Sequence, residues 1–354
     1  MRRSSSRRRG PRTARSDPVT HQEPGKSGGG RRFSPLTMVV VVVVVIALIL
    51  LAILIGTWLR PGPSLPPTSP GGSSSSTSAT AARPTSQPAD CPDVQVISVP
   101  GTLESSSKDD PYRPTFNPNS LMLKITAPLA QAFPAARADV WTTPYVAQLS
   151  NPVAIPPDGQ VSYEKSRTEG YDKSVAQIKK VYDKCKLTGF VLMGFSQGAV
   201  IAGDIAGEIG AGRGVIPAEN VLGVGLISDP RREPGDARTA GPNPPGVGVE
   251  VAYGGFSFGS LSLRGKREGG FGAVKDRAVS LCGNNDPICN QPKDIFQAGN
   301  IATTLPELQK VLTGNSHALY ATTTDWAANG QTATQWLQNW ARGVIDKAPK
   351  PPHS

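Results

Sequence analysis

The chain has 354 residues, four cysteines, three histidines and a formal net charge of +10. Its first 35 residues hold ten lysines and arginines against two carboxylates, so this segment alone contributes +8 (10 − 2). The basic charge therefore belongs to a tail, and it gives no evidence that the folded part binds nucleic acid. No aromatic or fold motif of nucleic-acid-binding proteins accompanies these arginines, so we expect no nucleic-acid partner.

Residues 36–59 follow this tail and contain no charged residue. A helix of about 20 apolar residues crosses a bilayer, whereas the apolar region of a cleaved signal peptide has only about 7–15. The preceding positive charges predict a cytoplasmic N-terminus, and Trp58 and Arg60 mark the opposite interface. We therefore expect residues 1–35 to be a cytoplasmic tail and residues 36–59 an uncleaved, single-pass signal anchor. A cleaved signal peptide is the alternative.

The composition changes again beyond the apolar segment. Residues 60–89 are rich in Pro, Ser, Thr and Gly, which predicts an extended linker without a core. Residues 90–348 have the composition and length of one globular α/β domain, and residues 349–354 are expected to be a disordered tail. Together with the anchor, this order predicts a globular domain on the extracytoplasmic side of the cell membrane, in the cell envelope.

All four cysteines lie in the globular part, beyond the apolar segment. An even number of cysteines in an exported domain indicates two disulfides, although the sequence alone permits three pairings. Cys282 and Cys289 are close enough for a local loop, which leaves Cys91 and Cys185 for a long-range bond. A zinc site is the competing interpretation, but its ligands would be spaced unlike the usual close cysteine pairs.

Short apolar runs alternate with amphipathic segments through the globular part. We expect strands at 94–99, 139–141, 190–193, 221–227 and 279–281, and helices at 163–184, 198–209 and 332–345. Strands that alternate with helices predict a mostly parallel sheet covered on both faces, a three-layer α/β sandwich. Residues 230–267, rich in Gly, Pro and Arg, do not fit this pattern. They are either a lid over an active site or a solvated insertion.

Ser196 lies in the motif Gly-Phe-Ser-Gln-Gly, between a predicted buried strand and a predicted helix. A nucleophilic serine on such a strand-to-helix turn projects above the sheet, beside the N–H groups of the helix start. A helix-capping serine is the alternative interpretation. Ser257 lies in a second copy of the motif, at 255–259, but no helical period follows it. We therefore expect Ser196 to be the nucleophile.

A nucleophilic serine needs a base, because a free hydroxyl is a poor nucleophile at neutral pH. His21 lies in the basic tail, and His353 is the second-to-last residue. His317 is therefore the one histidine that is expected inside the folded domain, and it follows Ser196 in the chain. The sequence predicts an enzyme of the serine hydrolase class.

The acidic partner of His317 should lie between Ser196 and His317 in the chain order of α/β-hydrolases. The candidates include Asp204, Asp229, Asp236, Asp276, Asp286 and Asp294. Asp204 on the helix after Ser196 is expected to be solvated, and Asp229 precedes two arginines, which favours a salt bridge. A disulfide that closed residues 282–289 would fix the position of Asp286, so Asp286 is the preferred acid.

An oxyanion hole needs two backbone N–H donors aimed at the developing charge. The amide of Gln197, directly after the nucleophile, is one candidate. The second should come from the loop after the first strand, where Thr102 also offers a hydroxyl. An ordinary turn at Thr102 is the alternative interpretation.

Taken together, these motifs resemble the cutinase family, and in particular the cutinase-like serine esterases of actinobacteria. The resemblance runs from Cys91 to about Trp340. It rests on 91–94, 101–104, 194–199, 229–232, the loop 282–289, and His317 followed by Tyr320. Two features depart from the family: Asn285 precedes Asp286 where a glycine is usual, and residues 230–267 exceed the corresponding stretch of the small fungal members.

The resemblance implies an α/β-hydrolase fold, and it implies disulfides Cys91–Cys185 and Cys282–Cys289. It further implies the site residues: Ser196 as nucleophile, Asp286 as acid, His317 as base, and Thr102 and Gln197 in the oxyanion hole. A membrane anchor is similar to that of one actinobacterial subgroup, which is associated with lipase, phospholipase and thioesterase activities and a lipid-rich envelope.

These features predict hydrolysis of an acyl ester or thioester of the cell envelope through an acyl-serine intermediate. The chemistry requires no metal or organic cofactor. The expected partners are an acyl lipid or ester substrate and the cytoplasmic membrane, while the sequence leaves the oligomeric state open. An envelope acyltransferase with the same intermediate is one alternative, since water and an alcohol compete for one acyl-enzyme. A non-catalytic scaffold with a hydrolase fold is another.

Overall fold

The computed structural model describes residues 83–151, 154–293, 295, 307, 310–311, 316–324, 326 and 330–354. By its internal contacts the chain divides into residues 1–79 and 80–354, and the described residues all belong to the second unit. The expected cytoplasmic tail, signal anchor and most of the linker therefore lie outside the described residues. Within the described part, no helix has the length and apolar character needed to cross a bilayer.

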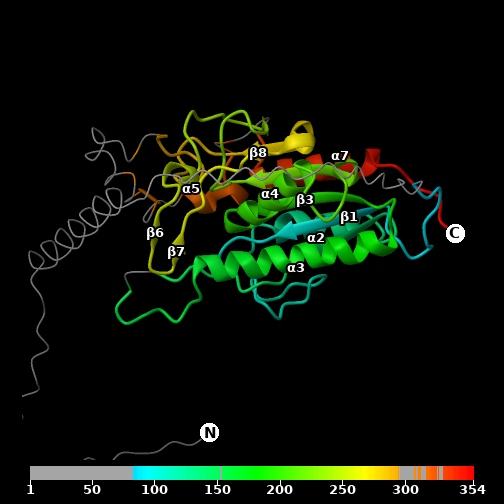
Figure 1. The fold of residues 1–354 in the computed structure, drawn as a ribbon, viewed down its shortest axis with the longest axis horizontal. Coiled ribbons are helices and arrows are strands. Elements are labelled where there is room, and N and C mark those ends of the chain that lie inside the picture. The colour runs from blue at the N-terminus through cyan, green and yellow to red at the C-terminus, as the bar shows by residue number, and fades with distance from the viewer. Residues whose placement is uncertain are drawn as a thin grey trace, which may run out of the picture. The chain divides into compact units, whose positions relative to one another are not determined.

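A six-stranded sheet forms the centre of the domain (Figure 1). Its strands are β1 (Val94–Val99), β2 (Ala138–Thr142), β3 (Gly189–Phe195), β4 (Val221–Ile227), β5 (Arg238–Thr239) and β8 (Ala278–Leu281). Their order is β2-β1-β3-β4-β8-β5, and every neighbouring pair is parallel. Every residue of β1 and β3 is buried, as expected for a parallel sheet covered on both faces. The α/β-hydrolase fold with a parallel sheet is confirmed.

Helices cover the two faces of the sheet. The long helices are α2 (Leu123–Ala132), α3 (Tyr163–Lys184), α4 (Gln197–Gly210) and α7 (Ala333–Lys347). Helices α2 and α7 pack together against one face, and α3 and α4 against the other (Figure 1). In β1 the side chains alternate accordingly: Val94 and Val96 join the core under α2 and α7, and Ile97 and Val99 join the core under α3 and α4.

Short elements complete the domain. They are η1 (Ala218–Asn220), α5 (Val249–Ala252), β6 (Ser257–Phe258), β7 (Leu261–Ser262), η2 (Gly272–Arg277) and η3 (Ser316–Ala321). Strands β6 and β7 form a separate antiparallel pair. Helix α7 begins with a capping box, in which Thr332 and Gln335 exchange side-chain and backbone hydrogen bonds. The cap fixes the start of the helix that the amphipathic pattern of residues 332–345 predicted.

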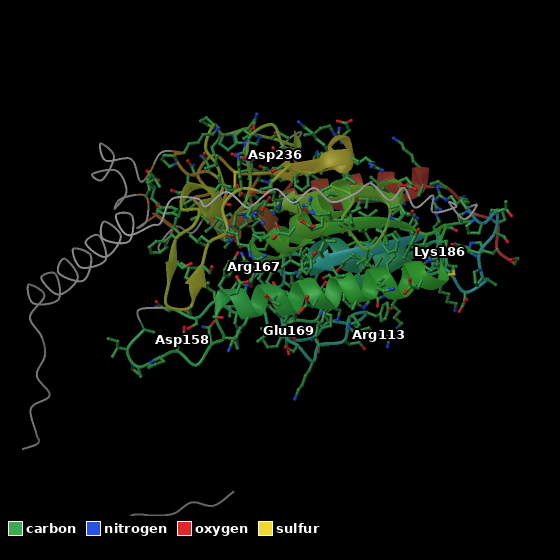
Figure 2. The ribbon with its side chains drawn as sticks, in the orientation of Figure 1. Arg113, Asp158, Arg167, Glu169, Lys186 and Asp236 are labelled. Atoms are coloured by element: carbon green, nitrogen blue, oxygen red, sulfur yellow. A yellow bond between two sulfur atoms is a disulfide. The ribbon has the colours of Figure 1, made fainter. Side chains whose placement is uncertain are left out.

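Residues 230–267 are packed into the domain through buried ion pairs, so they are not a solvated insertion. Arg267, 7% exposed, contacts Asp229 at 2.5 Å and Asp204 of α4 at 2.8 Å. Arg167 of α3, which Figure 2 labels, pairs with Glu250 of α5 at 3.0 Å. Carboxylates and guanidinium groups are buried in proteins when such pairing compensates for their desolvation. The pairs fasten the segment to the two helices on one face of the sheet.

The last residues of the chain are paired, which differs from the expected disordered tail. Gln87 donates its amide to the Pro352 carbonyl at 2.9 Å and accepts from the Ser354 amide at 2.9 Å. His353 contacts Asp93 at 3.0 Å, and this carboxylate raises the pKa of His353. The composition of residues 349–354 did not predict these backbone partners, which are distant in sequence; Figure 1 shows the first described residues, in cyan, beside the C-terminus.

The four cysteines form the disulfides Cys91–Cys185 and Cys282–Cys289. The first joins Cys91, in the segment that leads into β1, to the end of α3, and the second closes the loop after β8. The pairing agrees with the one implied by the family resemblance. It rules out the zinc interpretation, because a disulfide sulfur has no thiolate to offer a metal.

Candidate active site

Ser196 lies on the turn that joins β3 to α4, and its backbone adopts φ 53° and ψ −121°. Such a conformation is costly for a residue with a Cβ, and functional sites are where it is found. The flanking glycines make the turn possible: a Cβ on Gly194 would lie 2.2 Å from the Gly198 carbonyl oxygen, and a Cβ on Gly198 would lie 2.0 Å from the Val99 carbonyl oxygen. The turn therefore raises the serine above the sheet edge.

His317, in η3, lies between Ser196 and Asp286. Its Nε2 is 2.8 Å from Ser196 Oγ, and its Nδ1 is 3.2 Å from each carboxylate oxygen of Asp286. The three residues come from the β3–α4 turn, the loop after β8 and η3. Ser196 is 9% exposed and the His317 side chain 26%, so the pair borders the surface while Asp286 is buried.

The environment of Asp286 supplies several donors to its carboxylate. The hydroxyls of Ser228 and Tyr320 donate to Oδ2, the latter at 2.7 Å, and the Ile288 amide donates to Oδ1 at 3.0 Å. Burial raises the pKa of Asp286, but the hydrogen bonds and charge of His317, with the Ser228 and Tyr320 bonds, outweigh it, so the pKa lies below its ordinary value. The group is therefore a carboxylate at neutral pH.

Two aromatic side chains fix the position of the His317 ring. Phe195, the last residue of β3, stacks on it with ring centroids 4.9 Å apart. Tyr320 packs edge-on against Phe195 at 6.2 Å and accepts from the Gly283 amide at 2.8 Å. Burial, together with the Asp286 charge, raises the pKa of Tyr320 well above 10, so its phenol stays protonated and donates. Phe195 thus contacts the ring directly, while Tyr320 supports Phe195 and the Asp286 loop.

Thr102 and Gln197 lie together, on the loop after β1 and at the start of α4. The Thr102 hydroxyl donates to the Gln197 side-chain oxygen at 3.3 Å. Glu104 shapes this loop by accepting from the amides of Gly101 at 3.0 Å and Leu121 at 2.6 Å. The backbone N–H of Gln197 lies in the first turn of α4, where amides have no acceptor within the helix. The amide, and not the engaged Thr102 hydroxyl, is thus suited to meet an oxyanion.

The other candidate residues have different partners. Asp204 is buried and pairs with Arg231 and Arg267, which differs from the expected solvated carboxylate. Asp229 forms a salt bridge, but with the distant Arg267 and not with the arginines that follow it in the sequence. Ser257 is exposed in β6, where its hydroxyl donates to that of Ser262 at 3.4 Å. Asp294 lies outside the described residues.

Sequence reasoning missed one residue of the site, Ser228. It directly follows β4. The carboxyl ends of parallel strands meet at one edge of the sheet, where ligands and catalytic groups gather, and this position was the signal that could have identified it. Nothing in its local sequence distinguishes it from a turn serine.

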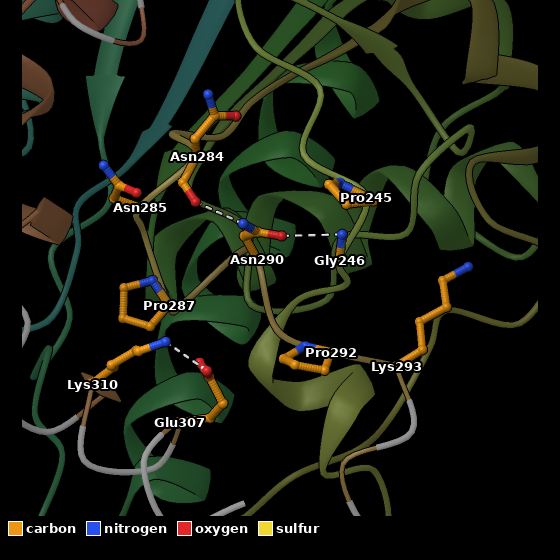
Figure 3. Close-up of a pocket in the computed structure, with 10 residues that line it drawn as sticks. All are labelled: Pro245, Gly246, Asn284, Asn285, Pro287, Asn290, Pro292, Lys293, Glu307 and Lys310. Atoms are coloured by element: carbon orange, nitrogen blue, oxygen red, sulfur yellow. Dashed lines mark hydrogen bonds and ion pairs between the residues drawn. The ribbon is translucent and has the colours of Figure 1, made fainter. Parts of the chain in front are cut away.

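A cavity of about 660 Å³ lies behind the Asp286 loop (Figure 3). Its lining includes Asn284, Asn285 and Pro287, which flank Asp286. The Asn290 side chain there bonds to the backbone, accepting from the Gly246 amide at 3.0 Å. Neither Ser196 nor His317 lines it. Among the described residues, no group of three or more histidines, cysteines or carboxylates is arranged to hold a metal ion.

Comparison with known proteins decides the family. The family model described as Cutinase matches residues 121–298. A protein named Carboxylesterase Culp6 homolog, from Corynebacterium glutamicum, is 43% identical over 269 residues, which cover 74% of this chain and 84% of that protein. The chain belongs to the cutinase family. As a member of the cutinase family it is a carboxylic ester hydrolase, as the sequence predicted.

Solved structures of lower identity are also similar to the chain. The catalytic core domain of acetyl xylan esterase from Trichoderma reesei is 18% identical, with a TM-score of 0.43 over 73% of this chain and 100% of that one. A cutinase-like protein from Cryptococcus sp. is 19% identical, with a TM-score of 0.35 over 66% and 97%.

Proposed function

We propose that this protein hydrolyses carboxylic esters through an acyl intermediate on Ser196, with His317 as general base and Asp286 as the acid that orients it. The observation that carries the proposal is the 2.8 Å contact of His317 Nε2 with Ser196 Oγ, while Nδ1 faces Asp286. A base within hydrogen-bond reach of a hydroxyl, and itself oriented by a third group, is the arrangement of an activated nucleophile.

The reaction then follows from the geometry. Ser196 Oγ attacks the ester carbonyl while its proton passes to His317 Nε2, and the imidazolium returns that proton to the departing alcohol. Water attacks the acyl-serine while its proton passes to His317 Nε2, and the imidazolium returns that proton to Ser196 Oγ as the acid is released. Asp286 stays ionised throughout and stabilises the imidazolium. The amides of Gln197 and Thr102 receive the charge on the former carbonyl oxygen.

We infer that the acyl group is apolar. Three large apolar side chains beside the site are exposed to solvent: Leu103 at 57%, Leu149 at 40% and Leu319 at 43%. Leu103 follows Thr102 in the expected oxyanion loop, and Leu149 follows Gln148, whose carbonyl accepts from the Gln197 side chain. Leu319 lies in η3 with His317. Exposed apolar side chains next to the segments of a site favour contact with an apolar ligand. An acyl lipid, such as a phospholipid or thioester of the cell envelope, fits this surface.

The location follows the same proposal. Residues 36–59 would anchor the chain in the cytoplasmic membrane with the enzyme domain outside, where lipid substrates lie. The two disulfides support an oxidising compartment, since disulfides persist outside the cytoplasm. Protease treatment of intact spheroplasts tests the topology: digestion of the enzyme domain is expected, and its full protection would contradict the proposal.

A fluorophosphonate probe on the full-length protein in detergent tests the activated serine. We expect labelling of the wild type that disappears in both Ser196→Ala and His317→Ala and persists in Ser257→Ala. Persistent labelling of Ser196→Ala would overturn the assignment, and an unlabelled but folded wild type would favour a scaffold. Product analysis with an added alcohol separates the two enzyme types, because a dominant transesterified product would identify an acyltransferase.

A further inference from the structure

Ser228 occupies a special place at the carboxyl end of β4. The residue is fully buried, and its backbone has φ 52°, a left-handed conformation that is uncommon for a serine. Its Oγ donates to Asp286 Oδ2 and lies 3.0 Å from His317 Nδ1. One hydroxyl therefore touches both the acid and the base of the proposed triad.

We propose that Ser228 is a positioning residue that sets the tautomer and orientation of His317; the inference rests on the function proposed above. An ionised carboxylate accepts hydrogen bonds only, so the single hydroxyl proton of Ser228 points to Asp286. The lone pairs of Oγ then face His317, and Nδ1 has three acceptors around it: Ser228 Oγ at 3.0 Å and both Asp286 oxygens at 3.2 Å. The ring proton must sit on Nδ1, which leaves Nε2 free to take the Ser196 proton.

The backbone of Ser228 is held by the strands on either side. Its amide donates to the Leu281 carbonyl at the end of β8 at 2.8 Å, and the preceding carbonyl, of Ile227, accepts from the Ser196 amide at 3.0 Å. The ends of β3, β4 and β8 thus bring nucleophile, hydroxyl and acid loop to one edge of the sheet. Such redundant support is what a strained backbone conformation needs in order to persist.

Buried ion pairs fix the next residue along the chain. Asp229 accepts from the Arg231 amide at 2.9 Å and contacts Arg267 at 2.5 Å, and Arg267 also reaches Asp204 on the helix that begins after Ser196. Because this cluster ties the turn after β4 to α4, it fixes the distance between Ser228 and the nucleophile. Among the described residues, the titratable groups next to His317 are Asp286, which contacts it, and Tyr320 of η3, which contacts Asp286.

The test compares Ser228→Ala and Ser228→Gly in the full-length protein, with steady-state kinetics on a soluble acyl ester across pH. We expect kcat to fall about tenfold, well below the roughly 10²–10⁴-fold that a general base supplies, because the ring keeps Asp286 but loses one acceptor. KM should change little, since Ser228 is buried away from substrate. Loss of this donor raises the pKa of Asp286, so the acid limb of kcat/KM, where Asp286 loses its charge, should move to higher pH.

Two controls separate this role from a structural one. Glycine accepts a positive φ without strain, so Ser228→Gly keeps the turn while removing the hydroxyl. Ser280 of β8 is also buried, and its hydroxyl has no hydrogen-bond partner among the described residues, so Ser280→Ala should leave the pH profile unmoved.

The possible outcomes are distinguishable. An unchanged kcat and acid limb in both Ser228 variants, with Ser196-dependent turnover intact in the wild type, would overturn the role of Ser228 alone. An equal loss in Ser280→Ala would assign the effect to packing and also overturn it. A wild type without Ser196-dependent turnover would instead overturn the proposed function.

Discussion

Two segments of the chain share the pattern Gly-Phe-Ser-x-Gly and fold in different ways. Residues 194–198 join a buried seven-residue strand to a fourteen-residue helix, whereas residues 255–259 run into the two-residue strand β6. Ser196 faces His317, while Ser257 is exposed and contacts another serine. The comparison teaches that the motif acquires chemistry from the elements around it, since a nucleophile needs a fixed base and nearby amide donors.

The glycines of the two segments also serve different physical needs. Gly194 and Gly198 are required by close approach, because a Cβ on either would collide with backbone atoms. Gly255 and Gly259 have φ 79° and 55°, so they are required by backbone conformation instead. The same pattern therefore forms a closely packed turn at residues 194–198 and contains glycines of positive φ at residues 255–259.

The largest expected difference between the segments is in turnover. Ser196→Ala should lower kcat by about 10⁴-fold or more, since it removes the nucleophile. Ser257→Ala should change kcat by no more than about twofold, as an exposed substitution distant from the site does. Hydrolysis of a chromogenic acyl ester measures both. Comparable losses in the two variants would mean that the second copy takes part in catalysis.

Asp286→Asn should lower kcat by about 10⁴-fold, because an amide nitrogen can donate to Nδ1 and favour the tautomer with its proton on Nε2. The protein should remain folded, as judged by circular dichroism and by an unchanged disulfide content. Asp276→Asn is the matched control: Asp276 is exposed in η2 and should be silent. Substantial turnover in Asp286→Asn would remove Asp286 from the proposed triad.

The glycines give a smaller, structural contrast. Gly198→Ala should cost about 3 kcal/mol of unfolding free energy, because the new methyl meets the carbonyl oxygen of Val99, which cannot move without disturbing β1. Gly259→Ala should cost only about 1 kcal/mol, from its positive φ, and should leave activity intact. Chemical denaturation measures both costs. Equal destabilisation by the two substitutions would contradict the distinction between close approach and backbone conformation.

Most of the sheet could be predicted because its strands are continuous apolar runs and its longest helices are amphipathic. Helix α2 was missed, since it contains Pro128, a residue that usually marks the end of a helix. The two-residue strand β5 is too short to carry a pattern. Local sequence thus identified the elements whose burial is continuous, and it missed those that tertiary packing selects.

The site divides along the same line. Ser196 was recognisable from the strand and helix beside it in the sequence, and His317 by elimination of the histidines near the two ends of the chain. The partners of Asp229 were not: Arg267 lies 38 positions away in the chain. Ser228 likewise acquires its contacts only when the ends of three strands converge, and no local pattern encodes that convergence.

A further predicted effect, smaller than that of Gly198→Ala, concerns Tyr320→Phe. The variant removes a hydrogen-bond donor to Asp286 and the acceptor of the Gly283 amide. It should therefore lower the free energy of unfolding by about 1.5 kcal/mol at neutral pH. It should also lower kcat several-fold. The cost depends on pH because the folded state lowers the pKa of Asp286. Stability from such a carboxyl is present above its unfolded pKa and is lost as pH falls through the folded value.

Tyr320→Phe raises that folded pKa, so the difference from the wild type should be greatest near pH 7 and shrink below about pH 4. Denaturation at several pH values measures it. Ser262→Ala, which removes the partner of Ser257, is the control and should show no such pH dependence, because no carboxylate contacts that pair among the described residues. A cost for Tyr320→Phe that stayed constant with pH would mean that the phenol supports the loop without acting on the Asp286 charge.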